Sequence, residues 1–145
     1  MRSLILFAAL FANTTLAHAE QRTVQSANDF DTTVQKLRDA IEASPASIVY
    51  EMNHAANATN AGLELRPTTL ILFGNPAAGT QLMQADPTAG LSLPMKVLVV
   101  ETDRGVELVY DDPAALAESY DLGEAAAVTE RMSGLLGNLT EAAAN

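Results

Sequence analysis

Histidine is the residue type in this chain that offers the most chemistry, because an imidazole can move protons near neutral pH or ligate a metal. The sequence has two histidines, His18 and His54. His54 follows an alternating apolar stretch at 48–53 that predicts a strand, and it precedes an Ala- and Asn-rich stretch that predicts a short helix or turn. Two interpretations stay open. The imidazole could ligate a metal or haem or act as a general base, or it could simply cap the turn.

Asn75 is the second candidate position. It follows the continuous apolar run at 69–73, which predicts a central strand buried on both faces. Asn75 is a good N-cap before Pro76, so a helix is predicted over 76–83. Free amides at such a start could hold an anion, although capping is the simpler explanation. Asn75 and His54 would converge only if their two strands were parallel neighbours, whereas the short connection favours an antiparallel pair.

Other chemistry finds little support in the residues. There is no cysteine, so cysteine nucleophiles, disulfides and zinc–thiolate sites are excluded. The formal net charge of −10 gives no basic surface for DNA or RNA, and no nucleic-acid partner is expected. Phosphate-loop, serine-hydrolase and calcium-loop motifs are lacking. Capping explains Asp112, and the scattered methionines are typical of core gap-fillers. No cofactor and no catalytic residue is identified.

The first 19 residues are typical of a secretory signal peptide. A basic start at Arg2 precedes an apolar run at 4–12, and Ala17 and Ala19 are the small residues that a signal peptidase requires. We expect cleavage between Ala19 and Glu20, and a periplasmic or secreted domain over 20–145. The apolar run is about half of what a membrane span needs, so no membrane association is expected after cleavage.

The remaining chain predicts a single α+β domain. Phe30, Val34, Leu37 and Ile41 form one apolar stripe, which predicts a helix that ends before Pro45. The turn at 103–105 predicts a hairpin between strands at 96–102 and 106–110. A C-terminal amphipathic helix is predicted at 124–143, and its two internal glycines could divide it into two segments. The order of elements favours a two-layer sandwich, with a mostly antiparallel or mixed sheet and helices packed on one face.

Four blocks of residues, in this order, resemble the domain of unknown function 302 family. They are His54 with the turn up to Pro67-Thr68-Thr69, then Phe-Gly-Asn-Pro-Ala-Ala-Gly-Thr at 73–80, Leu-Pro-Met-Lys-Val-Leu-Val at 93–99, and Val-Tyr-Asp-Asp-Pro at 109–113. The resemblance covers about 23–122. It implies a TATA-box-binding-protein-like fold, often as a homodimer, and no particular reaction. The family's usual block has Asp before the His, whereas Asn53 stands here and would orient the imidazole more weakly.

Three hypotheses for function follow. The first is an exported module that binds a small ligand or a partner, with His54, Asn53 and Asn75 as candidate ligand-binding residues. The second is a metal- or haem-binding protein that uses His54. The third is an enzyme of unrecognised type, which would require polar groups that converge beside His54 in a cleft.

Overall fold

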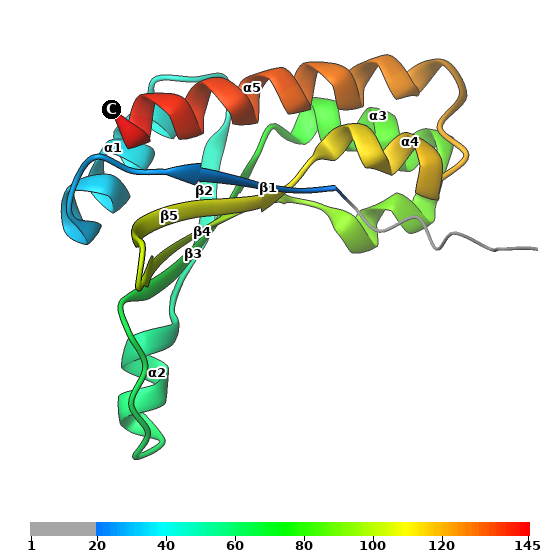
Figure 1. The fold of residues 1–145 in the computed structure, drawn as a ribbon. Coiled ribbons are helices and arrows are strands. Elements are labelled where there is room, and N and C mark those ends of the chain that lie inside the picture. Colours follow the sequence, from blue (N-terminus) through cyan, green and yellow to red (C-terminus); the bar gives the residue numbers. More distant parts are fainter. Residues whose placement is uncertain (1–19) are drawn as a thin grey trace, which may run out of the picture.

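A computed structural model describes residues 20–145, and the predicted signal peptide at 1–19 lies outside the described residues (Figure 1). Strands and helices alternate through most of the chain. The order is β1 (Gln21–Gln25), α1 (Phe30–Glu42), β2 (Ser47–Asn53), α2 (His54–Asn60), β3 (Thr68–Gly74), α3 (Pro76–Ala85), η1 (Pro87–Ser92), β4 (Met95–Thr102), β5 (Gly105–Asp111), η2 (Pro113–Ala115), α4 (Leu116–Ser119), η3 (Gly123–Ala125) and α5 (Ala126–Ala144).

The strands form one sheet in the order β1-β5-β4-β3-β2, and every neighbouring pair is antiparallel. This confirms the predicted α+β sandwich, in which the sheet proves to be wholly antiparallel. The hairpin between β4 and β5 turns at Asp103-Arg104, and Gly105 adopts a φ of 107° that a side chain would disfavour. β1 lies at one edge of the sheet and pairs only with β5.

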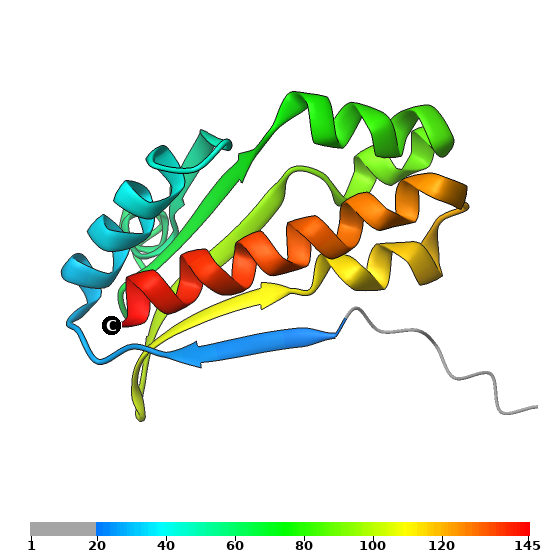
Figure 2. The same cartoon turned by 90° about the horizontal axis from the view of Figure 1, so that it is seen from above.

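Helices cover one face of the sheet and leave the other open. Figure 1 shows α1, α3, α4 and α5 on the same side, and Figure 2 shows α5 lying over the sheet, roughly along the direction of β5, with α1 beside it. Among the strand residues that face these helices, Ile71, Phe73, Val97, Val99 and Leu108 are fully buried. They pack against Leu37 and Ile41 of α1 and Leu136 of α5 in one continuous core.

The prediction that the run at 69–73 is buried on both faces is wrong. Ile71 and Phe73 are fully buried, but the alternating residues Leu70 and Leu72 are half-exposed. These two leucines belong to the open face, where Leu70 pairs with Met52 and Leu72 pairs with Tyr50. The run is therefore continuously apolar although helices cover only one of its two faces.

Capping residues fix where the helices begin. Asp29 accepts a hydrogen bond from the Thr32 amide at 2.9 Å and starts α1, and Asn75 caps α3 ahead of Pro76 as predicted. The predicted division of the C-terminal helix does not occur, because α5 runs unbroken through Gly134 and Gly137. Burial of its apolar side against the sheet outweighs the weak helix propensity of two glycines, about 1 kcal/mol each.

Gly134→Ala should therefore stabilise the protein. A Cβ at this position meets no atom within 4 Å, and the backbone is already helical. We expect the free energy of unfolding to rise by about 0.5–1 kcal/mol, because alanine has fewer unfolded conformations to lose. Urea denaturation measures the change, provided that the m-value stays the same. A lower urea midpoint for Gly134→Ala than for the wild type would show that the added methyl group does not fit.

Candidate functional site

The sequence-predicted candidates lie at opposite ends of the sheet. In the register of β2 with β3, Ser47 pairs with Gly74 and Asn53 pairs with Thr69. His54 therefore leaves the sheet at the end where β3 begins, whereas Asn75 lies where β3 ends. The antiparallel pairing expected from the short connection is confirmed, and these residues do not form one shared site.

Asn53 and His54 begin α2, which projects away from the helical layer (Figure 1). The Asn53 side-chain oxygen accepts a hydrogen bond from the Ala56 amide at 2.8 Å, so Asn53 acts as an N-cap. His54 is the first residue of the helix and is half-buried. Among residues 20–145, no cluster of three or more His, Cys, Asp or Glu side chains is placed to hold a metal ion.

Asn75 has both ends of its amide occupied by backbone groups. Its oxygen accepts from the Ala77 amide at 2.9 Å, and its nitrogen donates to the Pro45 carbonyl at 3.0 Å. The side chain thus ties the start of α3 to the chain segment that leads into β2. Asn75 also lines a groove at this end of the sheet, and its internal bonds hold one corner of that groove in place.

The groove is the best candidate site in the described chain. It has a volume of about 610 Å³, and its walls come from four separate segments within 45–49, 74–83, 90–95 and 128–135. Small-molecule sites usually occupy about 300–1,000 Å³ and are mostly apolar with a few polar groups. Of its 18 lining residues, all but Asn75, Thr80 and Arg131 are apolar or glycine. The groove therefore has the size and lining of a site for a small apolar molecule.

Glycines open the groove. A Cβ at Gly79 would lie 3.6 Å from the Leu93 Cδ1, and one at Gly74 would lie 3.5 Å from the Pro94 Cβ. Leu93 and Pro94 are themselves lining residues, so side chains at these glycines would extend into the groove. Met83 stands at its edge with 39 % of its surface exposed. A bound molecule would cover part of this apolar surface.

Sequence reasoning missed the groove but could have found part of it. Val128, Arg131, Met132 and Leu135 lie at i, i+3, i+4 and i+7, which is one face of α5. Arg131 is thus a cation within an apolar stripe, and this pattern could have been recognised from the sequence. The other walls meet only through the tertiary fold, and no local pattern joins them.

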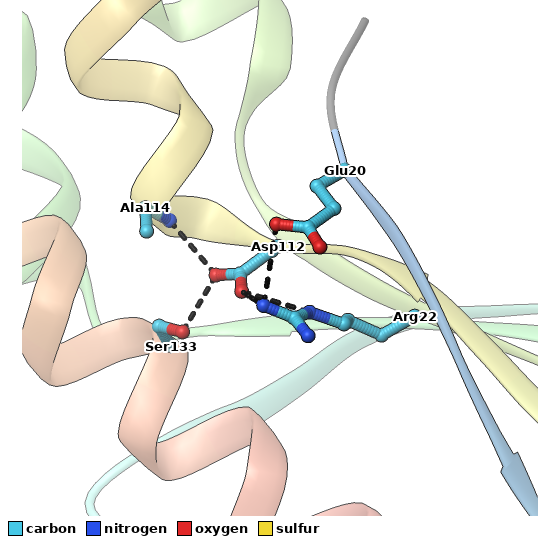
Figure 3. A network of polar contacts seen from close by, with 5 residues as sticks. All are labelled: Glu20, Arg22, Asp112, Ala114 and Ser133. Atoms are coloured by element: carbon cyan, nitrogen blue, oxygen red, sulfur yellow. Dashed lines mark hydrogen bonds and ion pairs between the residues drawn. The ribbon is translucent and has the colours of Figure 1, made fainter.

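Asp112 anchors the helix that forms this wall (Figure 3). Its Oδ1 accepts from the Ala114 amide at 3.0 Å and from the Ser133 hydroxyl at 2.6 Å. Its Oδ2 accepts from the Arg22 guanidinium at 3.2 Å. The Asp112 side chain is 9 % exposed, and its partly buried, charge-assisted hydrogen bonds join β1, the end of β5 and α5.

The environment keeps Asp112 ionised. Burial raises its pKa, but the hydrogen bonds from Ser133 and the Ala114 amide, together with Arg22, outweigh burial and leave the pKa below its ordinary value. A carboxyl group whose pKa is lower in the folded state stabilises the fold above its unfolded pKa of about 3.9. That contribution is lost as the pH falls through the folded pKa.

Asp112→Asn should lower the free energy of unfolding at pH 7 by about 1–3 kcal/mol, because the Arg22 pairing is lost and a buried group is left badly matched. Denaturant titrations from pH 7 down to pH 2.5 measure the effect. The difference in the free energy of unfolding between wild type and variant should become smaller in acid, because Asp112 of the wild type is then neutral in both the folded and the unfolded state. A difference that stays constant with pH would contradict the role of the charge.

Comparison with known proteins places the chain in a family. The model of the family described as domain of unknown function DUF302 matches residues 22–139. The fold is similar to the crystal structure of an uncharacterised conserved DUF302 protein from Bacillus stearothermophilus, with a TM-score of 0.77 and 14 % identity over 85 % of this chain and 97 % of that one.

Curated relatives share part of the chain. Proteins named fluoride-specific ion channel FluC 1 from Brucella suis biovar 1 (strain 1330) and FluC 2 from Brucella melitensis biotype 1 (strain ATCC 23456) are both 40 % identical over 102 residues, which is 70 % of this chain. This chain spans only 40 % and 38 % of their respective lengths. The family match covers most of the described domain, and the chain belongs to the family of the domain of unknown function DUF302.

Proposed function

We propose that this protein is an exported module that binds a small, largely apolar ligand in the groove between α3, α5 and the end of the sheet. The observation that supports the proposal is the groove itself, about 610 Å³ in volume and lined almost entirely by apolar residues and glycine. Burial of apolar ligand surface would supply most of the affinity, at about 25 cal/mol per Å² removed from water before the costs of association.

The walls favour binding over catalysis. The Asn75 amide is bonded to backbone, which leaves Thr80 and Arg131 as the polar lining groups with free side chains. His54, the basis of the metal, haem and enzyme alternatives, lies at the other end of β2. The fluoride-channel name belongs to proteins of which this chain spans about two-fifths, and the proposal does not depend on it.

Export is part of the proposal and rests on residues 1–19. If Ala19 is the last residue of the signal peptide, N-terminal sequencing of the protein recovered from the periplasm should begin at Glu20. Ala19→Arg should block cleavage, because the peptidase requires a small residue at this position. A cytoplasmic protein that retains Met1 and Arg2 would contradict export.

Filling the groove should weaken ligand binding. Gly79→Leu places a side chain toward Leu93 across the groove, and we expect it to weaken the binding of Nile red, a neutral apolar dye, at least tenfold. Fluorescence titration measures the affinity, and thermal melting without dye confirms that the variant folds.

Gly134→Leu is the matched control. It adds the same side chain to a helical glycine that has no atom within 4 Å and does not line the groove. Dye affinity should stay at the wild-type value. The proposal fails if the wild type does not bind the dye, or if Gly79→Leu binds it as tightly as the control does.

We further propose that the open face of the sheet joins two copies of the chain. Half-exposed apolar residues run across this face, and they include Met52, Leu70, Leu72, Leu98, Val100 and Val109. Among the strand residues in register with them, Lys96 carries a positive charge, and the charge of Glu107 is buried and paired with Arg104 at 2.7 Å. In a chain with a net charge of −10, this face lets two copies approach without placing like charges together.

Tyr50→Glu should separate the dimer. Tyr50 is 55 % exposed and pairs with Leu72 on the open face, so glutamate there would bring two negative charges into the interface without disturbing the core. Leu91→Glu, at a 90 % exposed residue outside the five strands, is the control. Sedimentation velocity should show a dimer for wild type and control and a monomer for Tyr50→Glu. A monomeric wild type would contradict the proposal.

A further inference from the structure

The geometry points to a ligand with an apolar body and a single carboxylate. The carboxylate would form an ion pair with Arg131 at the edge of the groove. This inference rests on the proposed function, because it names the class of molecule that the same groove holds. The argument comes from the charge of the lining, from the position of Arg131 on α5, and from the chemistry of a guanidinium.

Arg131 is the one charged residue among the 18 that line the groove, in a chain with 18 acidic and eight basic residues. Acidic side chains outnumber basic ones by more than two to one, yet none of them faces this site. Within residues 20–145, the ion pairs involve Arg22, Arg38, Arg66 and Arg104 but not Arg131. Its charge is therefore available to a ligand.

The position of Arg131 suits the polar end of an amphipathic molecule. It is exposed, whereas Val128 and Met132, its neighbours on the same face of α5, are buried. The apolar part of a ligand would lie against these residues and Leu93, and its charged end would reach Arg131 near solvent. The Asp112–Ser133 hydrogen bond holds this part of α5, so the cation is attached to a fixed wall.

The chemistry of the pair selects the class of ligand. A guanidinium presents a planar fork of donors that matches a carboxylate with two parallel hydrogen bonds. One cation neutralises one negative charge, and the surrounding net negative charge opposes a polyanion. A ligand cation would find no acidic lining residue, and a neutral ligand would leave Arg131 unpaired. A monocarboxylate therefore fits best.

Three probes with ten-carbon chains, in which the tenth carbon of decanoate is its carboxylate carbon, test the inference: decanoate, decanol and decyltrimethylammonium, each measured below its micelle concentration by isothermal titration calorimetry at pH 7. Decanoate should bind the wild type most tightly. Arg131→Gln should weaken the binding of decanoate about three- to tenfold and leave the affinity for decanol unchanged. The loss is moderate because the ion pair is partly exposed to solvent. Arg131→Lys should recover part of the affinity, and Arg131→Glu should reverse the preference toward the cationic probe.

The outcomes separate this inference from the proposed function. If decanoate and decanol bind equally and Arg131→Gln changes neither, the ligand class is wrong while binding in the groove stands. If no probe binds the wild type, both are wrong. Salt gives an independent readout, since raising it from 50 mM to 500 mM should weaken decanoate binding to the wild type more than to Arg131→Gln.

Discussion

The buried carboxylate of Asp112 is the interaction on which the arrangement of the other elements depends. A sheet covered by helices on one face has to fix those helices to its strands, and Asp112 does so at the end of β5. It bonds to Ser133 in the middle of α5 and to Arg22 on the edge strand, so the longest helix and the sheet edge share one charged group (Figure 3). Burial disfavours the charge of Asp112, but the hydrogen bonds from Ser133 and the Ala114 amide, together with Arg22, hold its pKa below the ordinary value.

That anchor explains why a groove persists beside a well-packed core. α5 packs on α1 and the sheet through buried residues such as Leu136 and Leu139, and the groove opens beside its N-terminal half. Gly74 and Gly79 lack the side chains that would fill this space, and Asn75 braces the corner by bonding to Pro45. The Asn75–Pro45 bond thus fixes the walls at 45–49 and 74–83 to each other, and the Asp112–Ser133 bond fixes the wall formed by α5. A preformed apolar site loses little ordering entropy when it binds a ligand.

Local patterns in the sequence predicted much of the fold and little of the site. The stripe from Phe30 to Ile41 and the Asn75-Pro76 start were confirmed, because periodicity and capping depend on neighbouring residues. The prediction for the run at 69–73 was wrong. Leu70 and Leu72 lie on an uncovered face that is itself apolar, and this gives the same continuous apolar sequence as a strand buried on both faces. α5 continues through Gly134 and Gly137 because of its packing in the folded protein, which helix propensities do not take into account. The groove joins four distant segments, and in it only Arg131, a cation in an apolar stripe, left a sequence signal.

Methyl NMR of protein labelled at methionine tests the central claim most directly, because the natural methionines already report on both surfaces. Met83, Met95 and Met132 line the groove, whereas Met52 lies on the open face of the sheet. Titration with decanoate should shift the methyl signals of the three groove residues along one saturation curve and leave the Met52 signal in place. Shifts confined to Met52, or no saturable shift in any of the four, would contradict a ligand site in the groove.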